Sequence, residues 1–452
     1  MSKVLLVNTY AYPNYPSLGL GYIGAYLKHF GHDVRIFDII KGIPEYEKTL
    51  ATFHPEFIGL NSFAMTDDDL RSLVCISREA SDAIIVVGGI YATSSPDLVF
   101  REIKPDILVL GEGEKKMLDI VEGKPTERID GVVTSKHRSY NFDFIEDLDA
   151  LPFPDREMMH AREYQSDWVH EQEPFTSVMT GRGCPWDCSF CGSKLMWKRQ
   201  VRRRSVSNVL EEIEQLLAQG WREIYFVDDT FTLSKSYVLD FCREIRERGL
   251  AFTWKSCSRV DVLDRETALA MKKAGCHTLL FGVESGNQKT LDFLNKRITL
   301  DETRRAFRIC REVGLKTVAS IMYNIPGETM EDMGNTFRFA RELRPTWVYA
   351  CSCSPYPNTD IASYLRNHGV ELSSLRLRPD GPATRSFMDE PSVQEINDEV
   401  ASFLFDFYAS PSYLPKVFAY GLSGFNSWRH TVRWAGRQAG GKFTRLFLRL
   451  VP

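Results

Sequence analysis

The sequence lacks the patterns that are typical of membrane-spanning and secreted proteins. No uninterrupted apolar run reaches the length of a membrane span, and the first residues lead directly into a strand pattern at 4–8 without a secretory leader. The net charge of −4 gives no overall reason to expect a nucleic-acid partner. Ten cysteines without a leader favour free thiols over disulfides, so we expect a cytoplasmic protein.

Length and composition are those of a globular protein of several domains. Hydrophobic residues make up 43% of the 452 residues and charged residues 26%, and two or three domains are expected at this length. The patterns described below indicate a first domain at 1–135, a linker at 136–172, a second domain at 173–370 and a mainly helical substrate or cap region at 371–452. The linker is marked by Pro152 and Pro154 and by weak periodicity.

A short loop at 181–193, GRGCPWDCSFCGS, gathers three cysteines, and no fourth Cys or His follows within reach. Zinc sites usually need four such ligands, so the spacing of Cys184, Cys188 and Cys191 argues against zinc. Three thiolates instead suit an iron–sulfur cluster that keeps one iron open for a substrate or cofactor. The alternative is three buried core cysteines, which are common singly but rarely share one loop with Gly, Pro and Trp.

The C-x3-C-x2-C spacing, with Phe190 before the last cysteine, resembles the signature of the radical S-adenosylmethionine (radical SAM) enzymes. The resemblance implies a catalytic [4Fe–4S] cluster held by Cys184, Cys188 and Cys191, whose open iron binds the amino and carboxylate groups of SAM. An electron from the cluster then cleaves SAM to a 5′-deoxyadenosyl radical. It also implies that Phe190 shields the cluster and adenine from water, and that a flavodoxin or ferredoxin supplies electrons.

Apolar runs alternate with helical patterns through the first 135 residues. The runs lie at 4–8, 33–38, 57–62, 83–89 and 107–114. Their near-continuous apolar character predicts a parallel sheet covered on both faces, as in a doubly wound, Rossmann-like α/β domain. Small residues stand at the strand ends, where ligands of such sheets bind, at Ser62, Gly88, Gly89 and Gly111. Tight turns explain glycines at these places about as often as a ligand does.

The order of these pieces is similar to the N-terminal domain of the cobalamin-binding radical SAM enzymes. PSLGLGYIGAYL follows the first strand, GLNSFAMT the third, GGIYAT the fourth and LGEGE the fifth. The resemblance covers nearly all of residues 1–130 and implies a cobalamin whose nucleotide tail lies against the small residues of the strand ends. The D-x-H-x-x-G loop that gives a histidine to cobalt in other cobalamin proteins is absent. Many members of the family bind cobalamin without it.

A second series of strand patterns begins at residue 175. Six candidates lie at 175–180, 223–229, 252–258, 278–284, 317–323 and 347–353, with helical patterns between them, one of them opened by a capping box at 299–302. Six such units predict a partial parallel (β/α)6 barrel with its chemistry at the carboxyl ends of the strands. Unusual residues stand there: Asp228, Asp229, Arg259, Glu284, Ser285, Asn324, Pro326, Gly327 and Glu328. A solvated helix cap is the alternative for any single acid among them.

The acids at these strand ends suit two groups of SAM, because its ammonium and its ribose hydroxyls both pair with carboxylates. By resemblance, Asp228 and Asp229 occupy the place of the amino-group motif of the family, although D-D-T stands here for the usual G-G-E. Glu284, followed by Ser285, matches the ribose-binding acid.

Two further positions suit the remaining groups of SAM. The SAM carboxylate requires a guanidinium, and Arg259 matches a carboxylate clamp by resemblance. Gly327 lies in the place of the glycine motif of the fifth strand, where the backbone meets adenine. Cys351 and Cys353 share one face of the last strand pattern, but no further ligands lie nearby, so a second metal site is the less favoured interpretation.

The end of the chain is strongly basic. From Tyr408 to Pro452 there is no acidic residue, and Phe443, Leu446, Phe447 and Leu450 follow helical spacing among lysines and arginines. This predicts an amphipathic basic helix that packs on the barrel or, alternatively, contacts an anionic membrane surface or an amphiphilic substrate. The aromatic stretch at 403–418 is expected to help wall a substrate pocket.

The domain before the barrel favours a cobalamin-dependent radical SAM methyltransferase acting on an unactivated carbon of a small molecule or natural product. In such enzymes one SAM gives the radical that removes hydrogen, a second SAM methylates cobalamin, and the substrate radical collects the methyl group. Members of the same architecture also catalyse cyclisations, so a radical SAM oxidoreductase or cyclase without methyl transfer is the alternative. A SAM- or cobalamin-binding regulator is disfavoured, because binding alone needs no open cluster iron.

Overall fold

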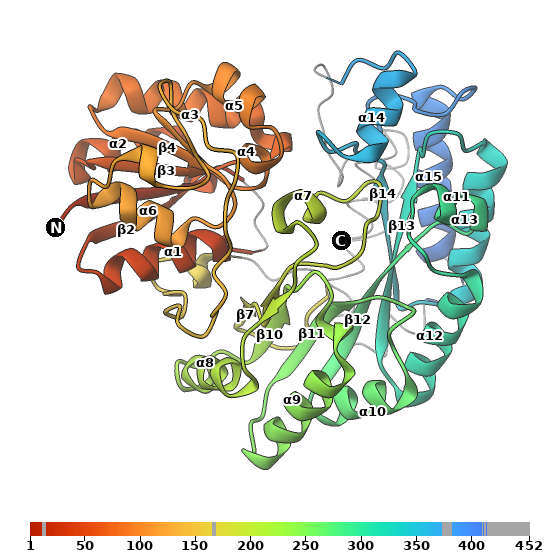
Figure 1. Ribbon diagram of the computed structural model, residues 1–452. Helices are drawn as coiled ribbons and strands as arrows, with labels where there is room; N and C mark the ends of the chain where they lie inside the picture. The colour runs from red at the N-terminus through yellow and green to blue at the C-terminus, as the bar shows by residue number, and fades with distance from the viewer. Residues whose placement is uncertain (11–14, 165–168, 373–381, 409, 411–412, 414–452) are drawn as a thin grey trace.

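The computed structural model describes residues 1–10, 15–164, 169–372, 382–408, 410 and 413. Two α/β units lie side by side, each built on a six-stranded sheet, with helix α7 (Ser193–Trp197) between them (Figure 1). Within the described ranges, no helix is long and apolar enough to cross a membrane. The basic helix expected near the end of the chain lies outside the described residues.

The N-terminal sheet has the strand order β2-β1-β3-β4-β5-β6, and every pair except β5/β6 is parallel. Its strands are β1 (Lys3–Asn8), β2 (Asp33–Asp38), β3 (Phe57–Asn61), β4 (Ile84–Gly88), β5 (Ile107–Val109) and β6 (Val132–Val133). Its helices are α1 (Leu18–His29), α2 (Ile43–Phe53), α3 (Asp67–Ala80), α4 (Ile90–Ser94), α5 (Pro96–Ile103) and α6 (Glu114–Val121). The doubly wound fold and its five predicted strands are confirmed. Antiparallel β6 was not predicted, because two residues are too few to show periodicity.

Alternate residues of β1 separate two hydrophobic cores. Leu5 and Val7 belong to the core under α2, α3 and α5, whereas Val4 and Leu6 belong to the core under α1 and α6. All four are buried, as expected for a strand covered on both faces. Met179 and Val227 of the second unit pack against the α1/α6 core, so this face of the sheet is turned toward the barrel.

The second sheet has the order β14-β13-β12-β11-β10-β7, with all pairs parallel and with β14 and β7 as its edges. Its strands are β7 (Phe175–Val178), β10 (Glu223–Phe226), β11 (Thr253–Ser258), β12 (Cys276–Glu284), β13 (Lys316–Tyr323) and β14 (Trp347–Ser352). Its helices are α8 (Val206–Ala218), α9 (Lys235–Glu247), α10 (Arg265–Lys273), α11 (Gln288–Phe293), α12 (Leu300–Val313), α13 (Met330–Leu343) and α14 (Asp360–Asn367). The predicted partial (β/α)6 barrel is confirmed, as is the capping box of Thr299 and Glu302 at α12.

Helix α15 (Val393–Tyr408) covers the β14 edge of the barrel (Figure 1). The Tyr408 hydroxyl accepts a hydrogen bond from the Val348 N–H and donates one to the Val348 carbonyl, both at 2.9 Å, which satisfies an otherwise open strand edge. Phe403 stacks on Phe337 of α13 at 4.3 Å, and Phe403 and Phe407 belong to the barrel core. The expectation that 403–418 walls a substrate pocket is therefore wrong for these aromatic residues, which seal the fold.

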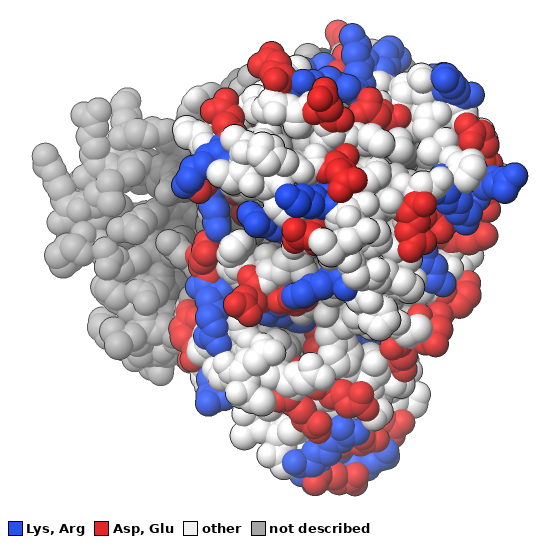
Figure 2. Space-filling view, turned by 90° about the vertical axis from the view of Figure 1, so that its left-hand side faces the viewer, with Lys and Arg blue, Asp and Glu red and all other residues white. Residues whose placement is uncertain are grey.

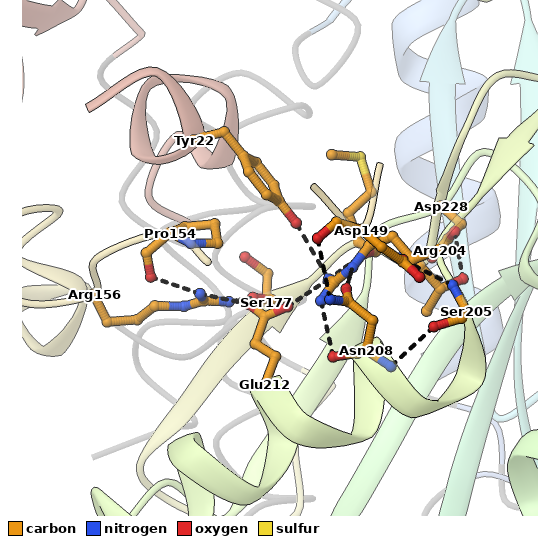
Figure 3. A network of polar contacts seen from close by, with 12 residues as sticks. Tyr22, Asp149, Pro154, Arg156, Ser177, Arg204, Ser205, Asn208, Glu212 and Asp228 are labelled. Atoms are coloured by element: carbon orange, nitrogen blue, oxygen red, sulfur yellow. Dashed lines mark hydrogen bonds and ion pairs between the residues drawn. The ribbon is translucent and has the colours of Figure 1, made fainter. Parts of the chain in front are cut away.

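A buried polar network joins helix α1 to the barrel (Figure 3). Arg204 donates to the Tyr22 hydroxyl at 3.2 Å and pairs with Glu212 of α8. Arg156 of the linker pairs with the other oxygen of Glu212 at 2.6 Å and donates to the Ser177 carbonyl at 2.7 Å. Burial raises the pKa of Tyr22 to about 12, so its hydroxyl stays neutral. Arg204 thus connects Tyr22 of the N-terminal unit to the barrel, whereas Arg156 connects the linker to the barrel through Glu212.

The outer face of the N-terminal unit carries charges of both signs. Figure 2 shows Lys and Arg interspersed with Asp and Glu over this face, with no broad area of one sign. Exposed ion pairs of the N-terminal unit include Lys48 with Glu45 on α2 and Arg71 with Asp67 on α3. Such pairs contribute little to stability and give no basic surface on this face.

Candidate active site

The cysteine loop lies at the carboxyl end of β7, framed by two short antiparallel strands, β8 (Gly181–Arg182) and β9 (Arg202–Arg203). Gly183 has φ +99°, and a Cβ there would collide with the Gln200 carbonyl, so only glycine fits before the first cysteine. Further along, the Ser189 N–H donates to the Leu294 carbonyl at 2.9 Å, and the Asn295 amide donates to the Asp187 carbonyl at 2.6 Å. The loop is therefore fixed against the segment after β12.

The three thiols of the loop are all at least partly buried. Cys188 is buried, and Cys184 and Cys191 are half-buried. Burial raises the pKa of Cys184, and it raises that of Cys191 to about 12, so metal binding is what would hold these sulfurs as thiolates. Within the described residues, no group of three His, Cys, Asp or Glu is placed to bind one metal ion.

Arg259 lies beside the loop, as predicted, but its guanidinium is already engaged. It is buried, pairs with Asp261 at 3.0 and 3.1 Å and donates to the Lys296 carbonyl at 2.9 Å. The guanidinium lies over the Trp186 ring at 4.1 Å, and its Nη1 is 4.0 Å from Cys188 Sγ. A cation and N–H donor at this distance would stabilise negative charge on a cluster sulfur.

Glu284 also lies at the rim, at the end of β12. Its φ of +60° places a non-glycine residue in the left-handed region, which is typical of functional sites. Its carboxylate accepts a hydrogen bond from Lys296 at 2.6 Å, and both side chains are buried. Burial opposes the charge of Lys296, but Glu284 and Cys188 raise its pKa. Lys296 also lies 5.8 Å from the centre of the Phe190 ring, which packs on the small apolar cluster behind the loop.

The two aspartates after β10 differ in what they can bind. Asp228 is buried and accepts hydrogen bonds from the Thr180 N–H at 3.2 Å and the Thr180 hydroxyl at 2.7 Å. Burial raises its pKa although Thr180 opposes the shift. Asp229 is exposed and accepts a hydrogen bond at 2.9 Å from Ser193, two residues after the last cysteine. Asp229 is therefore the aspartate that is accessible beside the loop.

The end of β13 adds a glycine and a buried acid. Gly327 has φ +78°, and a Cβ built on it meets nothing within 4 Å, so there is space beside it for a ligand. Glu328 accepts hydrogen bonds from Ser285 at 3.1 Å and Thr290 at 2.8 Å through one oxygen, while its other buried oxygen has no hydrogen-bond partner among the described residues. Burial raises the pKa of Glu328 to about 7. Ser285 thus bonds inward to Glu328.

A cavity of about 310 Å³ lies between the two units. It is lined on one side by residues of the sheet and α1, among them Leu6, Ile23 and Gly59, and on the other by residues from around the cysteine loop, among them Met196 and Trp197. β1 and β3 are the strands between which the strand order reverses, the place where ligands of doubly wound sheets bind. Ligand pockets of proteins span roughly 300–1,000 Å³, so this cavity suits one part of a large cofactor.

Three of the four small residues predicted for this cofactor line the cavity, namely Gly88, Gly89 and Gly111. A Cβ on Gly88 would make only ordinary contacts, whereas Gly89 has φ +102° and a Cβ there would lie 3.0 Å from the Ser62 N–H nitrogen. Ser62 does not line the cavity; its hydroxyl donates to the Gly88 carbonyl at 2.7 Å and accepts from the Ala92 N–H at 3.0 Å. Ser62 therefore holds the backbone at the strand end, whereas Gly88 leaves space in the cavity.

Several residues of the site were missed by sequence reasoning. Lys296 and Asp261 lie outside the strand ends, so no positional rule singled them out. Arg182 and Glu112 lie within the motifs GRGC and LGEGE, which were noted for their cysteine and glycines only. A pair of buried opposite charges in two motifs far apart in sequence is visible only once the fold brings them together.

Comparisons with known proteins agree with this geometry. A three-cysteine loop at the end of the first strand of a partial barrel defines the class of radical SAM enzymes, and the family model for the radical SAM superfamily matches residues 178–340. The model for the B12 binding domain matches residues 4–121. An uncharacterized methyltransferase from Pyrococcus horikoshii is 32% identical over 77% of this chain and 78% of its own length. The chain belongs to the cobalamin-binding radical SAM enzymes, whose cofactors are a [4Fe–4S] cluster, SAM and cobalamin.

Other relatives and solved structures extend the comparison. A cytidylyl-2-hydroxyethylphosphonate methyltransferase from Streptomyces wedmorensis is 26% identical over 77% of each chain, and an anaerobic magnesium-protoporphyrin IX monomethyl ester cyclase from Rubrivivax gelatinosus is 27% identical over 77% of this chain and 66% of its own. The methyltransferase TsrM from Kitasatospora setae, with cobalamin and a [4Fe–4S] cluster bound, aligns over both whole chains with a TM-score of 0.72 and 19% identity. At that identity the structure shows the fold alone.

Proposed function

We propose that this enzyme is a cobalamin-dependent radical SAM methyltransferase that methylates an unactivated carbon of a small molecule. The observation that carries the proposal is the cavity shared by the glycine-bearing strand ends of the B12 binding domain and the segment around the cysteine loop. When bound, the cluster would supply the electron that cleaves SAM, and cobalamin would supply the methyl group. We further propose the boundaries 1–135, 136–172, 173–370 and 371–452 for the N-terminal domain, linker, barrel and C-terminal region.

The chain would hold SAM through the rim residues described above. Cys184, Cys188 and Cys191 would bind the cluster, whose open iron takes the amino and carboxylate groups of SAM. Asp229 would be the accessible acceptor for the N–H groups of the SAM amino group, whereas Asp228 supports the strand end through Thr180. These assignments rest on the chemistry of each side chain and on its place beside the loop.

The remaining contacts to SAM follow from the buried ion pairs. Glu284 would accept from the ribose hydroxyls with one oxygen while Lys296 holds the other. Arg259, held by Asp261, would face the SAM carboxylate and the cluster sulfurs together. Gly327 leaves room for adenine, Ser285 keeps the adjacent strand end in place through Glu328, and Phe190 excludes water from behind.

The partners follow from the reaction class. TsrM has been solved with its substrate tryptophan, and a small-molecule substrate is proposed here by analogy. The cluster would need a one-electron donor, for which a flavodoxin or ferredoxin is proposed. Contact of the basic tail with a membrane surface or an amphiphilic substrate concerns residues outside the described ranges.

A second function is favoured by one group of relatives. Anaerobic magnesium-protoporphyrin IX monomethyl ester cyclases are among the similar proteins, at 27% identity in Rubrivivax gelatinosus and 25% in Cereibacter sphaeroides. A radical cyclase or oxidoreductase without methyl transfer would use the same cluster, SAM contacts and cobalamin domain. The two functions differ in whether the methyl group of SAM reaches the product.

The test uses SAM whose methyl group carries deuterium. The reconstituted enzyme, with cluster and cobalamin, is incubated anaerobically with a reductant, labelled SAM and small-molecule fractions of the native cells, and the products are analysed by mass spectrometry. We expect a compound that gains one labelled methyl group with the parent enzyme and not with Cys188→Ala. A new product without the label, formed together with 5′-deoxyadenosine, would contradict methyl transfer and establish the second function.

A further inference from the structure

We propose that Arg182 is a positioning residue that fixes the cysteine loop relative to the cobalamin-facing loop 111–114 by binding two carboxylates of that loop. The inference rests on the proposed function, because it concerns the geometry between the two cofactor sites.

The contact is a buried ion cluster across the two units. Arg182 donates through one nitrogen to Glu112 and through the other to Glu114, the second at 2.6 Å. Arg202, on the paired strand β9, donates to the other oxygen of Glu112 at 2.7 Å, and the Ile145 N–H donates to that same oxygen at 2.6 Å. The side chains of Arg182, Glu112 and Glu114 are only 5%, 2% and 4% exposed, so these charges are shielded from solvent.

A buried ion cluster of this kind contributes little to the free energy of folding. Burying four charges costs desolvation that their attraction barely offsets, and an apolar cluster of similar volume is often equally stable. A guanidinium does fix the relative orientation of its partners, because its planar fork binds two carboxylates in one geometry. The cluster therefore favours one arrangement of the two units over neighbouring ones.

The arrangement is transmitted directly to the first cysteine. Arg182 lies two residues before Cys184, and Gly183 between them is packed so closely on the Gln200 carbonyl that it leaves no slack. At the other end, Glu112 and Glu114 flank Gly113 in the loop that follows β5. Arg182, Glu112 and Glu114 all line the cavity between the units. A shift of the cluster would thus move both cofactor sites relative to each other.

Reactions between two bound groups depend steeply on their geometry, and a misplacement of about 1 Å can cost roughly a hundredfold in rate. The proposed reaction needs the cobalamin and the radical formed at the cluster to reach the same carbon. Arg182 supplies a rigid connection of this kind beside the cavity, next to the apolar contacts of Met179 and Val227.

The test measures the separation of the two cofactors. The parent, Arg182→Met and Arg182→Lys are reconstituted with the cluster and hydroxocobalamin and reduced, and the dipolar coupling between cob(II)alamin and the reduced cluster is recorded by pulsed electron paramagnetic resonance. The matched control is Arg156→Met, which removes an equally buried arginine from a pair with Glu212 that does not reach loop 111–114. Iron and cobalt content show whether each protein is fully loaded.

We expect one narrow distance distribution for the parent and for Arg156→Met, and a shifted and broadened one for Arg182→Met. Arg182→Lys keeps the charge but cannot bind both carboxylates in one plane, so its distribution should be intermediate; it also replaces Arg182→Met if that variant does not fold. A parental distribution in the loaded Arg182 variants would overturn the positioning role alone. A parent that takes up no corrinoid would overturn the proposed function and this inference together.

Discussion

The strand ends of the barrel and of the N-terminal sheet face each other in this enzyme, and the two rims form their candidate binding sites in opposite ways. At the barrel rim, side chains carry the chemistry: three thiols, the exposed Asp229 and the pairs Glu284–Lys296 and Arg259–Asp261 stand around one loop. At the rim of the N-terminal sheet, by contrast, Gly88, Gly89 and Gly111 line the cavity and Ser62 bonds inward, so few side chains reach into it from these strand ends.

This difference follows from the ligands that each region would hold. A cluster and SAM present charges, so their site needs paired carboxylates, cations and thiolates at set distances. The nucleotide tail of cobalamin mainly needs room against the backbone, and glycine supplies it. The barrel rim should therefore be sensitive to changes of charge, and the sheet rim to changes of volume.

The largest effect is expected from the cysteine loop. Replacing Cys184, Cys188 or Cys191 with alanine should abolish 5′-deoxyadenosine formation, because two thiolates cannot hold the cluster in place. The fold should persist, since the loop contributes little to the core. Cys75→Ala is the control, because Cys75 is an exposed residue of α3 and its loss should change nothing. Parental 5′-deoxyadenosine yield from any loop variant would contradict the cluster assignment.

A change of volume at the sheet rim should separate the two cofactors. Gly88→Leu keeps an allowed backbone but fills the cavity, so we expect cobalamin affinity to fall about ten- to a hundredfold, since overpacking costs roughly 1–3 kcal/mol. Gly89→Leu should lose cobalamin as well, but it also strains the backbone beside Ser62. Both should still cleave SAM. Ala51→Leu is the control for added volume, because Ala51 is exposed on α2. If Gly88→Leu and Gly89→Leu bind the corrinoid as tightly as Ala51→Leu does, the cavity is not the cobalamin site.

A change of charge at the barrel rim should weaken SAM binding while cobalamin binding stays intact. Glu284→Gln keeps the shape but loses the charged acceptor for the ribose and the partner of Lys296. A hydrogen bond to a charged group contributes about 1.5–3 kcal/mol, or roughly ten- to a hundredfold in SAM affinity measured by equilibrium dialysis. Glu302→Gln, in the exposed capping box of α12, is the matched control. Unchanged SAM affinity in Glu284→Gln would remove the ribose role.

The smallest effect concerns stability and pH. The pKa of Glu328 is about 7 in the folded chain, above its usual 4.5, so the folded state binds the proton more tightly than the unfolded state. The stabilising contribution of Glu328 to the folded state is complete below about pH 4.5 and is lost as the pH rises through about 7. We expect the free energy of unfolding of Glu328→Gln, taken relative to that of the parent, to rise by roughly 1–3 kcal/mol between pH 5 and pH 8. Thermal unfolding of both proteins at the two pH values checks this, and parallel pH dependence would contradict it.

The sequence was most informative where residues close together in the chain determine the outcome. The strands of both sheets, the capping box at Thr299 and the cysteine loop were predicted because periodicity, caps and spacing are local properties. Arg259, Glu284 and Asp229 were placed at the rim because parallel strands end at a common edge.

Sequence reasoning failed where partners come from distant parts of the chain. The pairing of Glu284 with Lys296, the hydrogen bond that Thr180 donates to Asp228 and the inward turn of Ser62 depend on packing that no spacing rule encodes. The same holds for the aromatic residues of α15, whose composition suggested a pocket although they seal the barrel edge. Burial decides whether a polar or aromatic residue serves the core or the site, and burial is a property of the fold.

The most direct test of the two cofactor sites is to load both cofactors into one preparation. The protein is reconstituted anaerobically with iron, sulfide and hydroxocobalamin, passed through gel filtration, and analysed by its visible spectrum and by iron and cobalt content. We expect one [4Fe–4S] cluster and one corrinoid per chain, with a lower corrinoid content in Gly88→Leu and no cluster in Cys188→Ala. A preparation that holds the cluster and cleaves SAM but takes up no corrinoid would contradict it.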